Sequence, residues 1–143
     1  DIMSVSKKLG GILIENTLVS NKINQCIIGI GININQEKFP DDLPMAVSIK
    51  QLTANDTPRD IFLQDLLNSI QNKFELIFEK KYEELWTQYE SLLYRKDKAH
   101  MFENIKGEQF MGVIRGVTKQ GTLQIEREDA SIDLYNFKEV SYL

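Results

Sequence analysis

Two isoleucine-rich segments near the start of the chain constrain its fold most strongly. They are residues 8–15 (Lys-Leu-Gly-Gly-Ile-Leu-Ile-Glu) and residues 25–33 (Gln-Cys-Ile-Ile-Gly-Ile-Gly-Ile-Asn), with a polar stretch between them. Short continuous apolar runs are typical of strands that are covered on both faces. They predict a hairpin in the middle of a sheet. Its two strands need neighbours at their outer edges, and we expect the missing strands upstream of Asp1.

Helical periodicity follows this hairpin. After a loop at residues 36–44 and a short helical turn at 46–52, Thr57 and Pro58 predict the N-cap and first residue of a long helix. The apolar residues at helical spacing in this helix are Phe62, Leu63, Leu66, Leu67, Ile70, Phe74, Ile77 and Phe78. A second helix is predicted at residues 82–93, with an inward face made of Leu85, Trp86, Tyr89 and Leu92.

From about Ala99 the pattern changes to short alternating segments. Turns are predicted at Lys106-Gly107, Gln120-Gly121 and Glu128-Asp129. Four or five strands with tight turns indicate a small closed barrel resembling an SH3 domain, because closure protects the edges of so short a sheet. The predicted fold class is therefore α+β: a partial mixed or antiparallel sheet with two helices at residues 1–94, then an SH3-like β-barrel at 95–143.

Composition narrows the chemistry. The chain has 143 residues, one cysteine and one histidine. A lone cysteine cannot form an internal disulfide, which favours a cytoplasmic location. A structural zinc site needs about four ligands, so the sequence does not predict one. We expect Cys26 to be a small buried residue and His100, in a predicted strand, to be a surface residue or a satisfied core residue.

No apolar run approaches the roughly 18 residues of a membrane span, so no membrane partner is expected. The net charge is −4, and the densest basic cluster is Arg95, Lys96 and Lys98, interrupted by Asp97. Nucleic-acid binding normally requires a larger positive face, so we expect no nucleic-acid partner for this chain. The cluster is interpreted as a solvated linker or as a face toward an acidic protein partner. The first residue is Asp1 rather than Met, so we expect the chain to begin at a cut.

Two glycine patterns are candidates for a ligand site. Lys8 is followed by Gly10 and Gly11 at the start of an apolar strand, which would let a ligand approach the backbone beside a positive charge. The alternative is a bulge with an exposed lysine. In the second segment, Gly29 and Gly31 leave one strand face bare, and Asn33 ends the strand with a donor and an acceptor. A plain strand with packed backbone neighbours is the alternative here, and no helix follows the glycines as a Rossmann fingerprint requires.

The order of these motifs resembles the second half of bacterial biotin–protein ligases. Asp1 is similar to the last residue of that family's Lys-Trp-Pro-Asn-Asp motif, and residues 8–11 resemble its lysine-containing strand. The further similar segments are residues 28–35, Phe39-Pro40, residues 46–48 and residues 116–123 of the predicted barrel.

This resemblance implies a two-step reaction. The carboxylate of biotin attacks the α-phosphate of ATP to give biotinyl-AMP and pyrophosphate, and a lysine of a biotin carboxyl carrier protein domain then attacks the mixed anhydride and releases AMP. It implies that Lys8 is the catalytic residue, that Gly10, Gly11, Gly29, Gly31 and Asn33 bind substrate and nucleotide, and that Asp1 lies near Mg²⁺. A homodimer is left open.

The chain also departs from the family pattern. The family's Gly-Arg-Gly-Arg-x-Gly loop is absent, and the chain ends in Val-Ser-Tyr-Leu without the arginine that some members carry there. We therefore expect these residues to be an incomplete and inactive piece of a ligase that is active at full length. Two alternatives remain, a non-catalytic module that docks a carrier domain and a relative of lipoate ligases.

Overall fold

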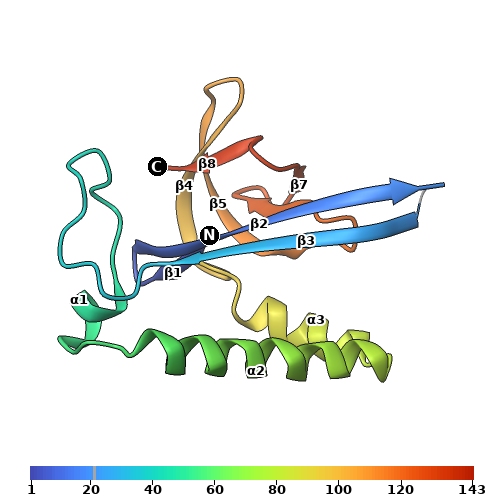
Figure 1. Ribbon diagram of the computed structural model, residues 1–143. Coiled ribbons are helices and arrows are strands. Elements are labelled where there is room, and N and C mark those ends of the chain that lie inside the picture. The colour runs from blue at the N-terminus through green and yellow to red at the C-terminus, as the bar shows by residue number, and fades with distance from the viewer. Residues whose placement is uncertain (21) are drawn as a thin grey trace. The chain divides into compact units, whose positions relative to one another are not determined.

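The computed structural model describes residues 1–20 and 22–143, which form strands, three helices and a second set of strands (Figure 1). This order confirms the predicted α+β class. The elements are β1 (Ile2–Ser4), β2 (Lys7–Val19), β3 (Lys22–Ile32), α1 (Ile49–Thr53), α2 (Arg59–Phe78), α3 (Tyr82–Ser91), β4 (Ala99–Asn104), β5 (Gln109–Val117), β6 (Leu123–Arg127), β7 (Ile132–Tyr135) and β8 (Val140–Tyr142). No helix within the described ranges is long and apolar enough to cross a membrane.

The chain divides into two compact units, unit 1 (Asp1–Gln71) and unit 2 (Asn72–Leu143). Helix α2 runs from the first unit into the second. The boundary at residues 94 and 95 between a catalytic part and a barrel stays a prediction.

Unit 1 contains an antiparallel sheet in the order β1-β2-β3. The predicted hairpin is confirmed, and its pairing runs from Gly10 opposite Ile32 to Val19 opposite Lys22. Both strands extend well beyond the apolar segments, into the polar stretch that was predicted to separate them. Backbone pairing in an antiparallel ladder does not depend on apolar side chains, so the ladder continues through these polar residues with one irregularity between Thr17 and Leu18.

The expected cover of the hairpin is not provided by the described residues. β1 pairs with one edge of β2, while β3 is the outer strand of the sheet. The isoleucines of both strands are about half exposed, for example Ile14 at 57% and Ile28 at 48%. Cys26 was predicted to be buried and is exposed, because it lies on this uncovered part of β3.

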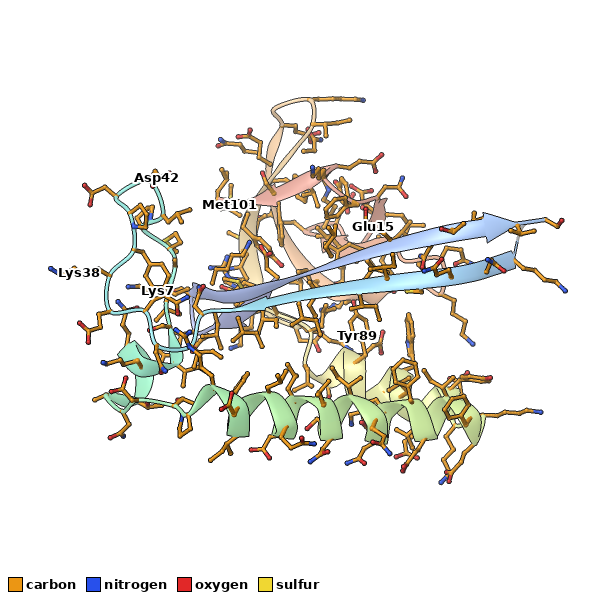
Figure 2. The ribbon with its side chains drawn as sticks, viewed as in Figure 1. Lys7, Glu15, Lys38, Asp42, Tyr89 and Met101 are labelled. Atoms are coloured by element: carbon orange, nitrogen blue, oxygen red, sulfur yellow. The ribbon has the colours of Figure 1, made fainter. Side chains whose placement is uncertain are left out.

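The segment between β3 and α1 is held by a buried serine. Figure 2 shows Lys38 and Asp42 on this loop. Ser48 is fully buried, donates its hydroxyl hydrogen to the carbonyl of Gln36, and accepts a hydrogen bond from the backbone N–H of Gln51. The Gln51 side chain accepts from the Ser48 N–H in return, which completes a capping box. The helical turn expected at 46–52 is thus α1, and it begins three residues later.

We expect Ser48→Ala to lower the free energy of unfolding by about 1–3 kcal/mol, because it removes the cap and leaves buried polar groups without a partner. Urea denaturation followed by circular dichroism measures this change. Ser91→Ala, at an exposed hydroxyl near the end of α3, is the control and should change stability much less. Equal effects of the two substitutions would contradict the assignment of Ser48 as the anchor of this segment.

The long helix begins within one or two residues of its predicted start. The Pro58 carbonyl accepts the bond from the Phe62 N–H, and the Asn35 side chain binds both the N–H and the carbonyl of Thr57. No residue of α2 is fully buried, although Phe62 and Leu66 are half-buried. With Leu63 and the β3 residues Ile30 and Ile32, they line a hollow of about 300 Å³. The predicted apolar face therefore faces β3 only at the start of the helix, and it packs there loosely.

In unit 2, α3 ends two residues earlier than predicted. Leu85 and Trp86 are half-buried as expected, but Tyr89 is 47% and Leu92 is 84% exposed. Leu92 lies after the last helical residue, so the helical periodicity that placed it inward does not apply to it.

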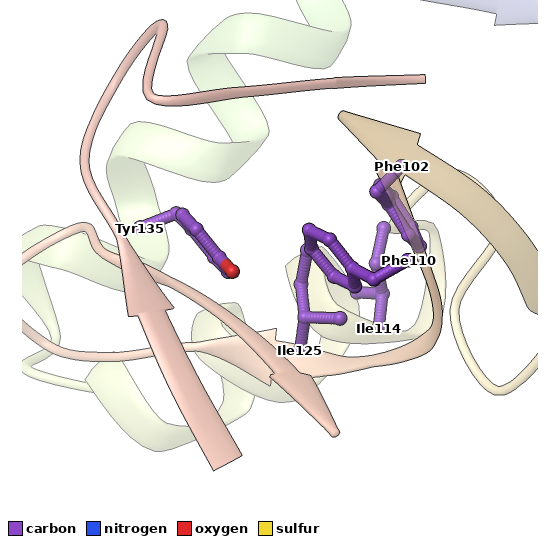
Figure 3. Close-up of a cluster of buried hydrophobic side chains, with 5 residues drawn as sticks. All are labelled: Phe102, Phe110, Ile114, Ile125 and Tyr135. Atoms are coloured by element: carbon purple, nitrogen blue, oxygen red, sulfur yellow. The ribbon is translucent and has the colours of Figure 1, made fainter. Parts of the chain in front are cut away.

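The five strands of unit 2 pair antiparallel in the order β7-β6-β5-β4-β8 around one core. Figure 3 shows that core, which consists of Phe102, Phe110, Ile114, Ile125 and Tyr135. The predicted turns are present, and Gly107 and Gly121 adopt the left-handed backbone conformation there, with φ of 77° and 87°. Strands β7 and β8 are the two edges, with no pairing between them in the part of the chain that the structure describes, so the predicted closure into a barrel is not confirmed.

His100 differs from both expectations for it. It is half-buried in β4, and its Nε2 atom is buried without a hydrogen-bond partner among the described residues. Burial lowers the pKa of the imidazole, and the charges of Arg95 and Lys98 lower it further.

This lowered pKa predicts a pH-dependent stability. As the pH falls, the unfolded chain takes up the proton first, at about pH 6.5, so the stabilisation by neutral His100 is present above that pH and is lost below it. We expect the free energy of unfolding to fall between about pH 7 and 5, and His100→Leu to flatten the curve in this range. Urea denaturation at a series of pH values measures it, and an unchanged slope in the variant would contradict the prediction.

Candidate functional site

Most of the predicted site residues line one pocket in unit 1, with a volume of about 450 Å³. Lys8, Gly10, Gly11, Gly31 and Asn33 all contribute to its walls. The other lining residues are Ile32, Phe39, Leu43 and Ala46. Gly29 does not line it, and Asp1 is connected to it through Lys8. The pocket thus combines a cation, bare backbone and an apolar wall.

Lys8 is held at the start of β2 by the chain segment that precedes α1. Its N–H donates to the Met45 carbonyl at 2.7 Å, and its own carbonyl accepts from the Val47 N–H at 2.9 Å. This places Lys8 opposite Ala46 in a short parallel bridge. The Lys8 Nζ lies 2.8 Å from Oδ1 of Asp1, and both side chains are about half exposed. An ion pair this exposed is weak, so a ligand anion can compete for the ammonium group.

The glycines of the site have different surroundings. A side chain at Gly10 would collide with the backbone of Gly31, so glycine is required there for the two strands to approach each other. A Cβ at Gly31 would meet no atom within 4 Å, and one at Gly11 would only touch the side chains of Asp1 and Lys8, at 3.6 and 3.8 Å. Gly11 and Gly31 are paired across the strands and share one face. Their backbone is therefore open toward the pocket.

Gly29 lies on the same face as Gly31, two residue pairs further along the hairpin and opposite Leu13. A Cβ there would make ordinary contacts with Leu13 at 3.8 and 3.9 Å. It lies outside the pocket, and a ligand contact at Gly29 stays a prediction.

Asn33 joins β3 to the segment before α1. Its N–H donates to the Leu9 carbonyl at 2.9 Å, and its side-chain Nδ2 donates to the Val47 carbonyl at 3.2 Å. Its own carbonyl accepts from the Ile49 N–H at 3.0 Å. Within residues 1–20 and 22–143, Oδ1 accepts no hydrogen bond, so it is the side-chain atom of Asn33 that can still accept one from a ligand.

Phe39, Leu43 and Ala46 were not predicted as site residues. They lie on the loop after β3 and form the apolar side of the pocket. The loop is drawn back to the strands by the hydrogen bond between Lys8 and Met45, which has no periodic signal in the sequence. Phe39 and Ala46 belong to the segments that carried the family resemblance, and this was the one signal that could have identified them.

The fit of Mg²⁺ to Asp1 can be tested against the donors present. No group of three or more metal-binding side chains occurs within the described ranges. Mg²⁺ usually keeps several waters and is bound by one or two carboxylates together with substrate phosphates. The half-exposed Asp1 carboxylate beside the pocket fits that mode as a single ligand.

Comparisons with known proteins give one consistent result. No protein-family model matches the chain. The bifunctional ligase/repressor BirA of Bacillus spizizenii and that of Bacillus subtilis are each 30% identical over 150 residues. The match covers 95% of this chain and 42% of those proteins, so the chain spans less than half of their length.

Solved structures agree with the sequence match. The apo structure of biotin protein ligase from Aquifex aeolicus has a TM-score of 0.73 at 24% identity. The match covers 98% of this chain and 60% of the Aquifex chain, and at that identity it is evidence for a shared fold. The same ligase in complex with biotin and ATP has a TM-score of 0.71 at 26% identity, over 95% of this chain and 56% of that one. Along nearly its whole length, the chain is therefore similar in sequence and fold to part of these ligases.

Proposed function

We propose that the protein containing this chain is a biotin–protein ligase, which uses ATP to attach biotin to a lysine of a carrier protein. The observation that supports this most is the pocket shared by Lys8, Gly11, Gly31 and Asn33 in a chain homologous to such ligases. Its one cationic side chain stands at the start of a strand, beside bare backbone and an apolar wall. This combination suits a ligand with an apolar or planar body and an anionic end.

In the first proposed step, an oxygen of the biotin carboxylate forms a bond to the α-phosphorus of ATP, and the bond to the bridging oxygen of pyrophosphate breaks. Negative charge gathers on the non-bridging phosphate oxygens in the transition state. Lys8 donates hydrogen bonds to these oxygens and stabilises the charge there more than in the ground state. Open backbone at Gly11 and Gly31 lets the acyl-adenylate lie close to the strands.

In the second proposed step, the amine of a carrier lysine attacks the acyl carbonyl, and AMP leaves with the bonding electrons. The amine loses a proton to solvent, and the products are an amide and AMP. Asn33 Oδ1 is proposed to accept a hydrogen bond from the adenine amino group. Mg²⁺, held by Asp1 and the phosphates, would neutralise phosphate charge.

The proposed partner is the biotin carboxyl carrier domain of a carboxylase, and the proposed location is the cytoplasm. A homodimer belongs to the same proposal. These assignments follow from the resemblance and from the lone cysteine, which forms no internal disulfide.

The test uses the full-length protein with ATP, Mg²⁺ and a purified carrier domain. We expect the mass of the carrier to increase by one biotinyl group when biotin is supplied, and to stay unchanged with lipoate. Modification with lipoate alone would favour the lipoate-ligase alternative. Carrier binding without any modification would favour the docking module.

A further inference from the structure

Unit 2 contains a row of aromatic rings, buried at one end and partly exposed at the other, with an arginine near each end. The centroids of neighbouring rings in this row are 5.3–5.9 Å apart, in the order Tyr94, Tyr142, Phe102, Phe110 and Tyr135. Figure 3 shows the part formed by Phe102, Phe110 and Tyr135. Near one end, the Arg127 guanidinium lies 3.4 Å from the centre of the Phe110 ring. Near the other, the Arg95 guanidinium lies 5.0 Å from the Tyr94 ring and 4.9 Å from the Tyr142 ring.

The two arginines differ in their hydrogen bonds. Arg127 donates to Asp133 at 2.7 Å and to the Tyr135 hydroxyl at 2.9 Å, and lies 3.6 Å from Glu108. Arg95 makes no ion pair and donates no hydrogen bond to any residue that the structure describes, although it is half-buried. Ring faces attract its charge but do not accept in-plane hydrogen bonds as a carboxylate does. Arg95 is therefore held in place with its planar donor edge available.

The surroundings of Arg95 favour an anion. It lines a hollow of about 380 Å³ together with Lys96, Asp97, Lys98 and Glu90. Both acidic residues there are already paired, Asp97 with Arg115 at 2.7 Å and Glu90 with Lys96 at 3.5 Å. Lys98 is exposed. Two cations in this hollow, Arg95 and Lys98, therefore have no carboxylate partner within the described ranges. The net charge of the whole chain is negative.

We propose that Arg95 and Lys98 form a docking site for a carboxylate-bearing segment of a protein partner. Arg95 binds one carboxylate through its planar edge, and Lys98 binds a second as a point charge. A carboxylate partner is favoured over nucleic acid because this hollow offers two cations without a carboxylate partner among the described residues, whereas nucleic-acid binding needs an extended basic face. The site requires neither ATP nor biotin, so it is independent of the proposed ligase function.

Fluorescence anisotropy of a labelled oligoglutamate peptide, titrated with the full chain at low ionic strength, tests this site. We expect saturable binding that weakens as salt is added. Arg95→Met keeps an apolar stem against the two tyrosines and should weaken binding about tenfold or more. Arg95→Lys keeps the charge without the planar edge and should also weaken it. Lys138→Met removes an exposed lysine elsewhere in unit 2 and should leave binding unchanged.

Thermal unfolding of each variant separates lost binding from lost folding. The proposal is overturned if Arg95→Met and Arg95→Lys both fold and bind the peptide as the unaltered chain does. It is also overturned if Lys138→Met weakens binding equally, because the peptide would then be attracted by charge in general. Tighter binding of single-stranded DNA than of oligoglutamate, lost in Arg95→Met, would assign the site to nucleic acid instead.

Discussion

Replacing Lys8 by alanine in the full-length protein is expected to lower the rate of adenylate formation by roughly 100- to 1,000-fold, the usual effect of removing one charge-stabilising donor. The fold should persist, because the lysine side chain is half exposed and its one ion pair, with Asp1, is weak. Pyrophosphate release in the presence of ATP and biotin measures the rate.

Lys7 is the matched control for this substitution. It immediately precedes Lys8 as the first residue of β2 (Figure 2), is exposed, and does not line the pocket. Lys7→Ala should therefore leave pyrophosphate release close to that of the unaltered protein. Unchanged turnover in Lys8→Ala would remove Lys8 from the proposed chemistry, and equal losses in both variants would point to a general effect of charge.

Replacing Gly31 by valine is expected to weaken the binding of biotin and ATP by about tenfold or more, with little change in stability. A side chain at this position meets no protein atom within 4 Å and extends into the space that the ligand is proposed to occupy. Valine also suits a strand. Isothermal titration and thermal unfolding measure the two quantities separately.

Gly10→Ala is the contrasting variant, because its Cβ would collide with the Gly31 backbone. It should lower the free energy of unfolding by about 1–3 kcal/mol, through overpacking between the strands. If Gly31→Val bound both ligands normally, the pocket floor would have been assigned wrongly.

The hairpin, the helices and the turns of unit 2 could be predicted because each depends on local patterns. The isoleucine runs favour strands, Thr57 and Pro58 mark a helix start, and the glycines at 107 and 121 occupy positions with positive φ. Exposure could not be predicted in the same way. Cys26 was placed inward by its apolar run and Leu92 by helical spacing, but the described residues around them do not cover them.

The candidate site could be predicted only in part. Lys8, the glycines and Asn33 lie on two strands whose pairing follows from the hairpin, so their proximity is a consequence of register. The wall made by Phe39, Leu43 and Ala46 depends on two backbone hydrogen bonds between Lys8 and the segment before α1. Such long-range bonds involve no particular side chain, so the sequence contains no local signal for them.

The uneven distribution of buried side chains has a consequence for how the molecule opens. Five large hydrophobic residues form the core of unit 2, whereas among the described residues of unit 1 only Val47 and Ser48 have buried side chains. Amide protons of the β2–β3 hairpin should accordingly exchange with solvent sooner than those of β4 and β5. A ligand that binds to the hairpin would then stabilise it, because the hairpin's side chains bury little apolar surface themselves. Ligand binding would be measured as slower amide exchange along both strands.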